Sequence, residues 1–198
     1  MRIFLSILAL AFAFTVQARE DLVEGGRSKN GLYEVRIVQD PDGNDLEYTY
    51  AIYDTRSGKR LAQLGDVGGC FKYEQAIHQS NALWNDSSSF VALADSDSRH
   101  TVQIYIFHVS DTSCDRLIVA DFVQNSLGRV DATEIDLRCH SSPERWDGNQ
   151  LHVILTFGVA HATRGRVCYN CEAVLKCAEL DSIARLVSVS KPEDIEVE

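Results

Sequence analysis

The chain has 198 residues, of which 45% are hydrophobic, and its 29 acidic residues against 19 basic ones give a formal net charge of −10. A chain of this length folds as one ordinary domain and buries about 70% of its extended surface. The acidic balance argues against nucleic acid as a partner, because phosphate binding depends on clustered Lys and Arg. It also disfavours anionic lipid surfaces.

The N-terminus has the pattern of an export signal. Met1-Arg2 precedes an uncharged, apolar run over residues 3–14, and Val16 and Ala18 are the small residues that signal peptidase requires. We therefore predict a signal peptide over residues 1–18, cleaved after Ala18. The apolar run is shorter than the roughly 20 residues of a membrane span. We expect an exported protein, periplasmic or secreted, with no membrane span after cleavage.

After the signal we expect a linker over residues 19–30, one β-rich domain over 31–188 and an acidic tail over 189–198. The main pattern of the domain is an alternation of apolar and polar residues, as in Tyr33, Val35 and Ile37, which is typical of half-buried strands. Further strands are predicted at residues 46–52, 60–64, 90–94, 101–109, 116–122, 130–137 and 151–159.

Two of these runs carry more detail. Residues 101–109 are apolar on both faces, which predicts an inner strand that is covered on both sides. Residues 151–159 form the cleanest single apolar face of the chain. Helix is predicted only for a turn or two at residues 71–79 and, after a strand that runs through Cys177, for a short segment at 180–186. The fold class is therefore all-β, an antiparallel meander or sandwich of short strands.

Two segments, Tyr50 to Leu64 and Tyr105 to Val119, share a strand, a turn and a returning strand. The second follows Ala82-Leu83-Trp84-Asn85-Asp86-Ser87, which continues to a short strand ending near Leu93. This arrangement resembles a blade of the TolB-like and WD-type β-propellers. The resemblance implies a blade-like meander of strands, and it implies no function.

The chain contains six cysteines, an even number that indicates disulfide bonds in an oxidising compartment. We expect one to three bridges, whose pairing sequence does not determine. Candidates for these bridges are Cys70, Cys114, Cys139, Cys168, Cys171 and Cys177.

Cys168 and Cys171 form a C-x-x-C pair, which allows two alternatives. A helix after Cys171 would make the pair similar to a thiol-disulfide redox motif, whereas a strand would place the two thiols on opposite faces. The pair could also bind zinc together with Cys177, His140 or His161, although the second pair of a zinc ribbon is missing. We predict structural disulfides, and no metal or cofactor.

Other motifs are less specific. The six histidines are scattered, and His108 and His152 fall within predicted strands; a hydrolase site assembled in space stays an alternative, although no G-x-S-x-G motif is present. Residues 40–45 and 95–97 superficially resemble calcium loops but fit hairpin turns better. Asn85-Asp86-Ser87 is a glycosylation sequon. Trp84 and Trp146 are expected to cover the core rather than to form a recognition patch.

These observations predict a non-catalytic, exported binding domain whose partner is another protein or an envelope component. The alternatives are a thiol-disulfide redox protein that uses Cys168 and Cys171, and a hydrolase. No motif in the sequence identifies a catalytic residue.

Overall fold

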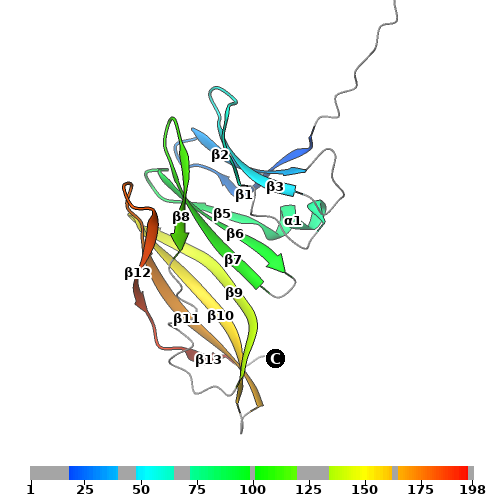
Figure 1. Cartoon of the computed structure of the whole chain (residues 1–198), viewed down its shortest axis with the longest axis vertical. Helices are drawn as coiled ribbons and strands as arrows, with labels where there is room; N and C mark the ends of the chain where they lie inside the picture. Colours follow the sequence, from blue (N-terminus) through cyan, green and yellow to red (C-terminus); the bar gives the residue numbers. More distant parts are fainter. Residues whose placement is uncertain are drawn as a thin grey trace, which may run out of the picture.

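A computed structural model describes residues 18–39, 48–64, 72–98, 101–119, 134–161 and 165–195. Within these residues the protein is all-β, as predicted, with a single helix of seven residues (Figure 1). The elements are β1 (Glu20–Arg27), β2 (Tyr33–Gln39), β3 (Tyr48–Asp54), β4 (Arg60–Leu64), α1 (Tyr73–Gln79), β5 (Asn81–Trp84), β6 (Phe90–Ser98), β7 (Thr101–Val109), β8 (Cys114–Val119), β9 (Glu134–Asp147), β10 (Gln150–His161), β11 (Gly165–Lys176), β12 (Ile183–Val189) and β13 (Glu193–Ile195).

The strands follow one continuous path of neighbours, β4-β3-β2-β1-β5-β6-β7-β8-β12-β11-β10-β9, with β13 beside β11. Most pairs are antiparallel, but β1 and β5 are parallel. β8 and β12 are also parallel and meet only at Ile118 and Val119 against Ile183 and Ala184. A parallel contact between β7 and β9 connects the two ends of the path β7-β8-β12-β11-β10-β9. These six strands therefore form a ring. In Figure 1 the green strands β5–β8 lie between β1–β4 above and β9–β13 below.

Strands β6 and β7 are shared by two hydrophobic cores. The first core lies between β1–β4 with α1 on one side and β5–β7 on the other, and contains Phe107. The second core fills the ring of strands and contains Ile106. These adjacent side chains point in opposite directions, and each is at most 1% exposed. The prediction that residues 101–109 form an inner strand with both faces covered is therefore confirmed.

The apolar face predicted at residues 151–159 lies on β10 and forms one wall of the second core. Its five inward side chains are fully buried: Leu151, Val153, Leu155, Phe157 and Val159. β10 pairs antiparallel with β11 along twelve residues, from Gln150 opposite Lys176 to His161 opposite Gly165. The predicted alternation is present in the structure, because every second side chain of a strand points to the same face, and this face of β10 lines the core.

The predicted helix at residues 180–186 is wrong, since β12 begins at Ile183 and runs to Val189. β12 pairs with β11, and Ala184 is completely buried in the second core. Burial of alternate residues outweighs the helix propensity of Ala, Leu and Arg, which is worth only tenths of a kcal/mol per residue. The strand that was predicted to run through Cys177 agrees to within one residue with β11, which ends at Lys176.

Both segments that were expected to lie outside the domain contain strands. The expected linker over residues 19–30 contains β1, which pairs with β2, and the expected tail contains β13, which pairs with β11. In β1 only Val23 and Gly26 are buried, so apolar alternation could not identify it. β13 has three residues, and none of them is buried.

A glycine allows β1, the inner strand of β1–β4, to pair with β5. Gly25 has a φ of +65°, and a Cβ there would lie 2.1 Å from the carbonyl oxygen of Ala82 on β5. The neighbouring carbonyl of Gly26 accepts a hydrogen bond of 2.9 Å from the indole nitrogen of Trp84. Because no other residue tolerates both this φ and this approach, Gly25 fixes where β1 meets β5.

The tryptophans behave as predicted. Trp84 is 3% exposed and stacks on Tyr33 with 6.0 Å between ring centroids. Trp146 packs beside Phe90 and donates a 2.9 Å hydrogen bond to the carbonyl oxygen of Leu83. Trp146 directly precedes the β9–β10 turn, in which Gly148 has a φ of +55°. Both rings therefore close the cores.

Strands β5 to β8 form a four-stranded antiparallel meander in chain order. This is the local arrangement that the propeller resemblance implies, while the relationship to propellers itself stays a prediction. Parts of the predicted runs at residues 46–52, 116–122 and 130–137 lie outside the described residues, as does the turn at 40–45.

The outer face of β1–β3 is held by an ionic network. The carboxylate of Glu34, only 7% exposed, accepts hydrogen bonds from Arg36 at 2.8 Å and from Arg27 at 2.6 Å. Hydrogen bonding to Arg36, assisted by Arg27, lowers the pKa of Glu34 despite its burial. Arg36 also binds Glu20, which accepts a bond from Tyr53.

The lowered pKa makes a prediction about acid stability. Because Glu34 is ionised more readily in the folded chain than in the unfolded one, its contribution is present above the ordinary Glu pKa of about 4.3 and is lost as the pH falls below it. We expect Glu34→Gln to lower the free energy of unfolding by about 1–2 kcal/mol at pH 7. Urea unfolding at pH 7 and pH 3 checks this, and an equal difference at both pH values would contradict it.

Candidate functional site

The C-x-x-C pair lies within β11, and no helix follows it up to residue 195, where the described part of the chain ends. Cys171 points into the second core and is 3% exposed, whereas Cys168 lies on the opposite face and is half-buried. This is the strand alternative of the sequence analysis, in which the two thiols cannot meet. The helix N-terminus that would activate a redox thiol is missing here.

The structure forms no disulfide among Cys114, Cys168, Cys171 and Cys177. Cys70 and the side chain of Cys139 lie outside the described residues. Burial raises the pKa of Cys114 and of Cys177 to about 12. Burial therefore favours the protonated thiol at both residues. Bridges involving the six cysteines stay a prediction.

These thiol environments predict an order of reactivity. In the reduced native protein we expect iodoacetamide to modify Cys168 well before Cys114 and Cys177, because a thiol with a pKa of about 12 holds little thiolate at pH 8. Timed alkylation followed by peptide mass spectrometry measures the three rates. Labelling of Cys114 or Cys177 as fast as Cys168 would show that the described burial is wrong.

The proposed zinc ligands do not come together in the described part of the chain. There, no group of three or more His, Cys, Asp or Glu side chains is arranged to hold a metal ion. Cys168 and Cys171 face opposite sides of β11, and His140 is exposed on β9. The side chain of His161 lies outside the described residues.

Of the histidines whose side chains the structure describes, His152 has the most polar surroundings. On the outer face of β10, its Nδ1 lies 2.5 Å from Glu172 and 2.8 Å from Arg145. The bond to His152 lowers the pKa of Glu172. His108 instead packs against the ring of Phe90, with 5.1 Å between centroids. A hydrolase that used His152 would need a nucleophile beside it. The described polar contacts of His152 are to Arg145 and Glu172, which are charged groups of the neighbouring strands.

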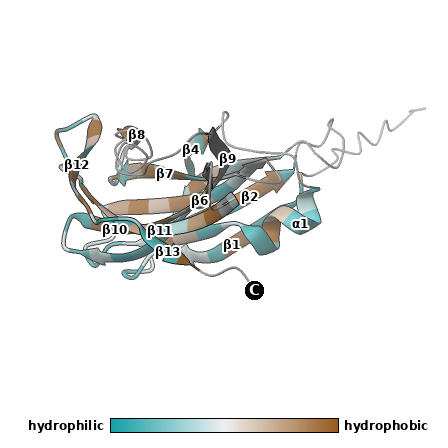
Figure 2. Ribbon diagram, turned by 90° about the horizontal axis from the view of Figure 1, so that it is seen from below, coloured by the Kyte–Doolittle hydropathy of each residue, from teal (hydrophilic) through white to brown (hydrophobic). Residues whose placement is uncertain are grey.

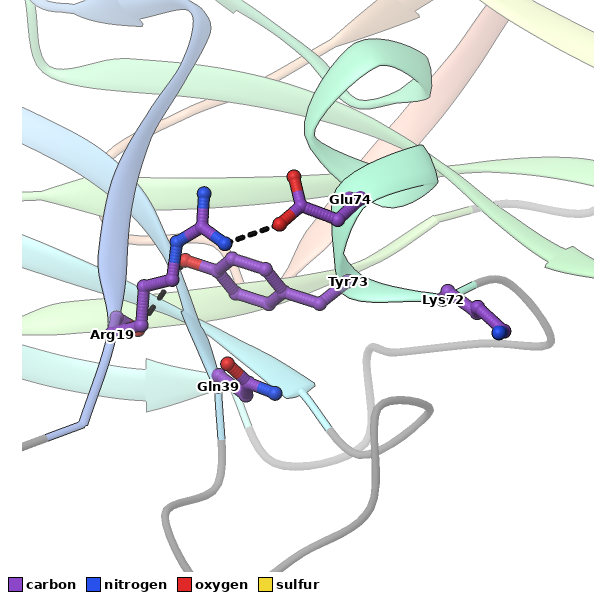
Figure 3. A pocket seen from close by; sticks show the side chains of 5 residues that line it. All are labelled: Arg19, Gln39, Lys72, Tyr73 and Glu74. Atoms are coloured by element: carbon purple, nitrogen blue, oxygen red, sulfur yellow. Dashed lines mark hydrogen bonds and ion pairs between the residues drawn. The ribbon is translucent and has the colours of Figure 1, made fainter. Parts of the chain in front are cut away.

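A small surface pocket of about 160 Å³ lies where β1, β2 and α1 meet. It is lined by Arg19, Gln39, Lys72, Tyr73 and Glu74 (Figure 3). Arg19 extends over the ring of Tyr73, with 5.0 Å to the centroid, and forms an ion pair with Glu74. Because these groups bind one another, the pocket anchors the start of β1 to the helix.

The sequon and one calcium-like segment have structural roles. Asn85 is 1% exposed, and its side-chain oxygen accepts the backbone N–H groups of Ser89 and Phe90, each at 3.0 Å. It closes the turn before β6 and is inaccessible to a glycosylating enzyme in the folded protein. Asp95 is buried within β6 rather than in a turn.

A candidate interaction surface lies where β8 meets β12. In the described residues five large apolar side chains are exposed, and four of them lie on β8, on β12 or in the turn before β12. We call these four the seam surface: Ile118 (65% exposed), Leu180 (100%), Ile183 (42%) and Val187 (54%). The fifth, Leu22, lies on β1 and is 45% exposed. Figure 2 shows hydrophobic stretches along β12.

The topology explains why these side chains are exposed. Leu117 points into the second core, so its neighbour Ile118 lies on the opposite face of β8. Likewise Ala184 is buried in the ring, and Ile183 points outward beside Ile118. Strands β1–β4 cover this face over β6 and β7, and no described element covers it at β12.

Leu180 is unusual for its position. The N–H of Asp181 bonds to the carbonyl of Ala178 at 3.0 Å, so Leu180 is the third residue of a tight turn. Turn residues at such positions are usually Gly, Asn, Asp or Ser, and a fully exposed Leu leaves its whole apolar surface in water. Sequence reasoning missed this surface, because Leu180 and Ile183 fell in the predicted helix.

No family model matches the chain, and no curated protein matches it. No helix in the described residues is long and apolar enough to cross a membrane.

Proposed function

We propose that this protein is a non-catalytic binding domain that holds a partner protein through the seam surface. The observation that carries the proposal is the concentration of exposed apolar side chains at Ile118, Leu180, Ile183 and Val187. Exposed apolar patches mark sites of protein interaction. Exposed arginines lie beside these side chains, at Arg116 and Arg185, and Arg is enriched at protein interfaces.

The proposal includes export, with cleavage after Ala18 by signal peptidase. Sequence supports it, and cleavage there would leave every described strand intact, because β1 begins at Glu20. It would place the new amino terminus at Arg19, which already contacts Asp21 and Glu74. Mass spectrometry of the protein from its natural compartment tests the cleavage, and an N-terminus other than Arg19 would contradict it.

Site-specific crosslinking tests the binding surface. A photo-crosslinking amino acid replaces Leu180, and in a matched control it replaces Leu22, the exposed apolar residue away from the seam. We expect a discrete protein adduct in the exported fraction from the Leu180 variant and none from the Leu22 variant. Absence of an adduct at position 180, or the same adduct at both positions, would refute the proposal.

A further inference from the structure

The peptide bond at which we expect signal cleavage, Ala18–Arg19, lies directly before β1. Strand pairing begins at the next residue, with Glu20 opposite Val38 on β2. Ala18 is partly buried, and it packs against a small hydrophobic cluster on the outer face of β2 and β3: Val38, Ala51 and Tyr53. The side chain before this bond is therefore in contact with the folded domain.

The residue after the bond is held by its main chain and by its side chain. The carbonyl oxygen of Arg19 accepts a 2.9 Å hydrogen bond from the backbone N–H of Gln39, and the hydroxyl of Tyr73 lies 3.3 Å from the same oxygen. Figure 3 shows the guanidinium group of Arg19 beside Glu74, with which it forms an ion pair. β2 and the first turn of α1 therefore fix the position of Arg19.

Glu20, the second residue after the bond, is held through its carboxylate. The hydroxyl of Tyr53 donates to it at 2.7 Å, and Arg36 forms an ion pair with it at 3.2 Å. Three consecutive residues, from Ala18 to Glu20, thus contact the domain. These contacts form only when the start of β1 lies against β2 and β3.

A signal peptidase needs the same groups. Recognition of an extended segment uses its main-chain hydrogen bonds and its alternate side chains, and a signal peptidase reads the small side chain directly before the bond that it cuts. In the folded protein the main chain of Arg19 already bonds to Gln39, and the side chain of Ala18 already packs on the sheet. Cleavage therefore requires the start of β1 to separate from β2, which is a local unfolding step.

We propose that the folded domain protects the Ala18–Arg19 bond, so that signal peptidase must cut this bond before β1 joins the sheet. This inference rests on the export part of the proposed function and adds the order of the two events. In the reaction the amide bond breaks, and water supplies the hydroxyl group to Ala18 and the hydrogen to the nitrogen of Arg19. A folded chain is cut only through its transiently opened state, so a chain that folds first keeps residues 1–18.

Cleavage of the whole chain tests this order. The 198-residue protein is purified in a nonionic detergent and given to signal peptidase either folded or freshly diluted from urea. Intact mass and N-terminal sequencing follow the appearance of a chain that begins at Arg19, and circular dichroism verifies the folded sample. We expect the folded chain to be cut at least tenfold more slowly than the chain diluted from urea. Equal rates would overturn the inference.

Two variants place the same new residue on adjacent positions of β1. Val23 is 1% exposed and Leu22 is 45% exposed. Val23→Asp puts a charge into the first core, which prevents β1 from docking, and it should be cut under folding conditions at least tenfold faster than wild type. Leu22→Asp is the matched control and should be cut as slowly as wild type. Cleavage of Val23→Asp as slow as that of wild type would overturn the inference.

Two further outcomes separate this inference from the proposed function. Absence of cleavage at Ala18–Arg19 in both the urea-diluted chain and Val23→Asp would contradict export by signal peptidase, and the inference would fail with it. Cleavage at this bond at one rate in wild type, Val23→Asp, Leu22→Asp and the urea-diluted chain would overturn the protection alone. Export and the binding surface would then both stand.

Discussion

Ile106→Ala and Phe107→Ala are each expected to destabilise the protein strongly, although the two residues are neighbours on one strand. Each is at most 1% exposed, one in each core. Truncation of a buried Ile or Phe to Ala costs about 2–5 kcal/mol, through lost burial and the cavity left behind. Chemical denaturation followed by tryptophan fluorescence and circular dichroism measures both free energies of unfolding.

The neighbouring strand supplies the matched control. On β8, Leu117 is 2% exposed and Ile118 is 65% exposed. Leu117→Ala should therefore cost about 2–5 kcal/mol, while Ile118→Ala should change stability by no more than about 0.5 kcal/mol. If Ile106→Ala or Phe107→Ala were as mild as Ile118→Ala, β7 would not be covered on both faces.

Tyr50→Phe should have the second large effect, because it removes a buried polar junction. The hydroxyl of Tyr50 donates to Asp95 on β6 at 2.5 Å and also contacts Ser80, which follows α1. All three residues are at most 2% exposed. Burial, followed by the charge of Asp95, raises the pKa of Tyr50, so its hydroxyl stays protonated as a donor.

Loss of the Tyr50 hydroxyl leaves a buried carboxylate with one donor fewer, which costs about 3 kcal/mol for a charged group. The matched control is Tyr53→Phe, whose hydroxyl donates to the partly exposed Glu20 at 2.7 Å, and it should cost about 1 kcal/mol or less. The free energies of unfolding in guanidinium chloride compare the two variants. A smaller loss for Tyr50→Phe than for Tyr53→Phe would contradict the role of this junction.

The central strands could be predicted from sequence because burial imposes a simple period. β4 and β7 have the predicted bounds, and the fully apolar pattern of β7 correctly indicated two covered faces. The same reasoning identified the inward face of β10. In these strands side-chain alternation is the direct consequence of the cores on either side.

The pattern failed where tertiary contacts form a strand that has little burial of its own. β1 contains two adjacent glycines, and it is held by backbone pairing to β2 and by the close approach of Gly25 to β5. β13 is a three-residue pairing against β11. β12 has helix-forming residues, but burial of Ala184 fixes it as a strand. Neighbours distant in sequence decide each of these cases.

The candidate site was not predictable for a related reason. In the sequence Ile118 and Ile183 have the character of core residues. They are exposed because β1–β4 pack over β5–β7 and do not cover the place where β8 and β12 meet. Conversely, the conspicuous C-x-x-C motif and the Asn85 sequon proved to lie within strand and turn structure. Local motifs were therefore poor guides to the site, and the uncovered face of the ring identified it.

The most direct test of the binding surface compares two single substitutions at equally exposed apolar residues. Ile183 is 42% exposed on the seam surface, and Leu22 is 45% exposed on β1. The affinity of the partner captured at position 180 is measured by titration calorimetry against wild type, Ile183→Ser and Leu22→Ser. We predict at least tenfold weaker binding for Ile183→Ser and unchanged binding for Leu22→Ser, whereas equal affinities for all three proteins would contradict binding through the seam surface.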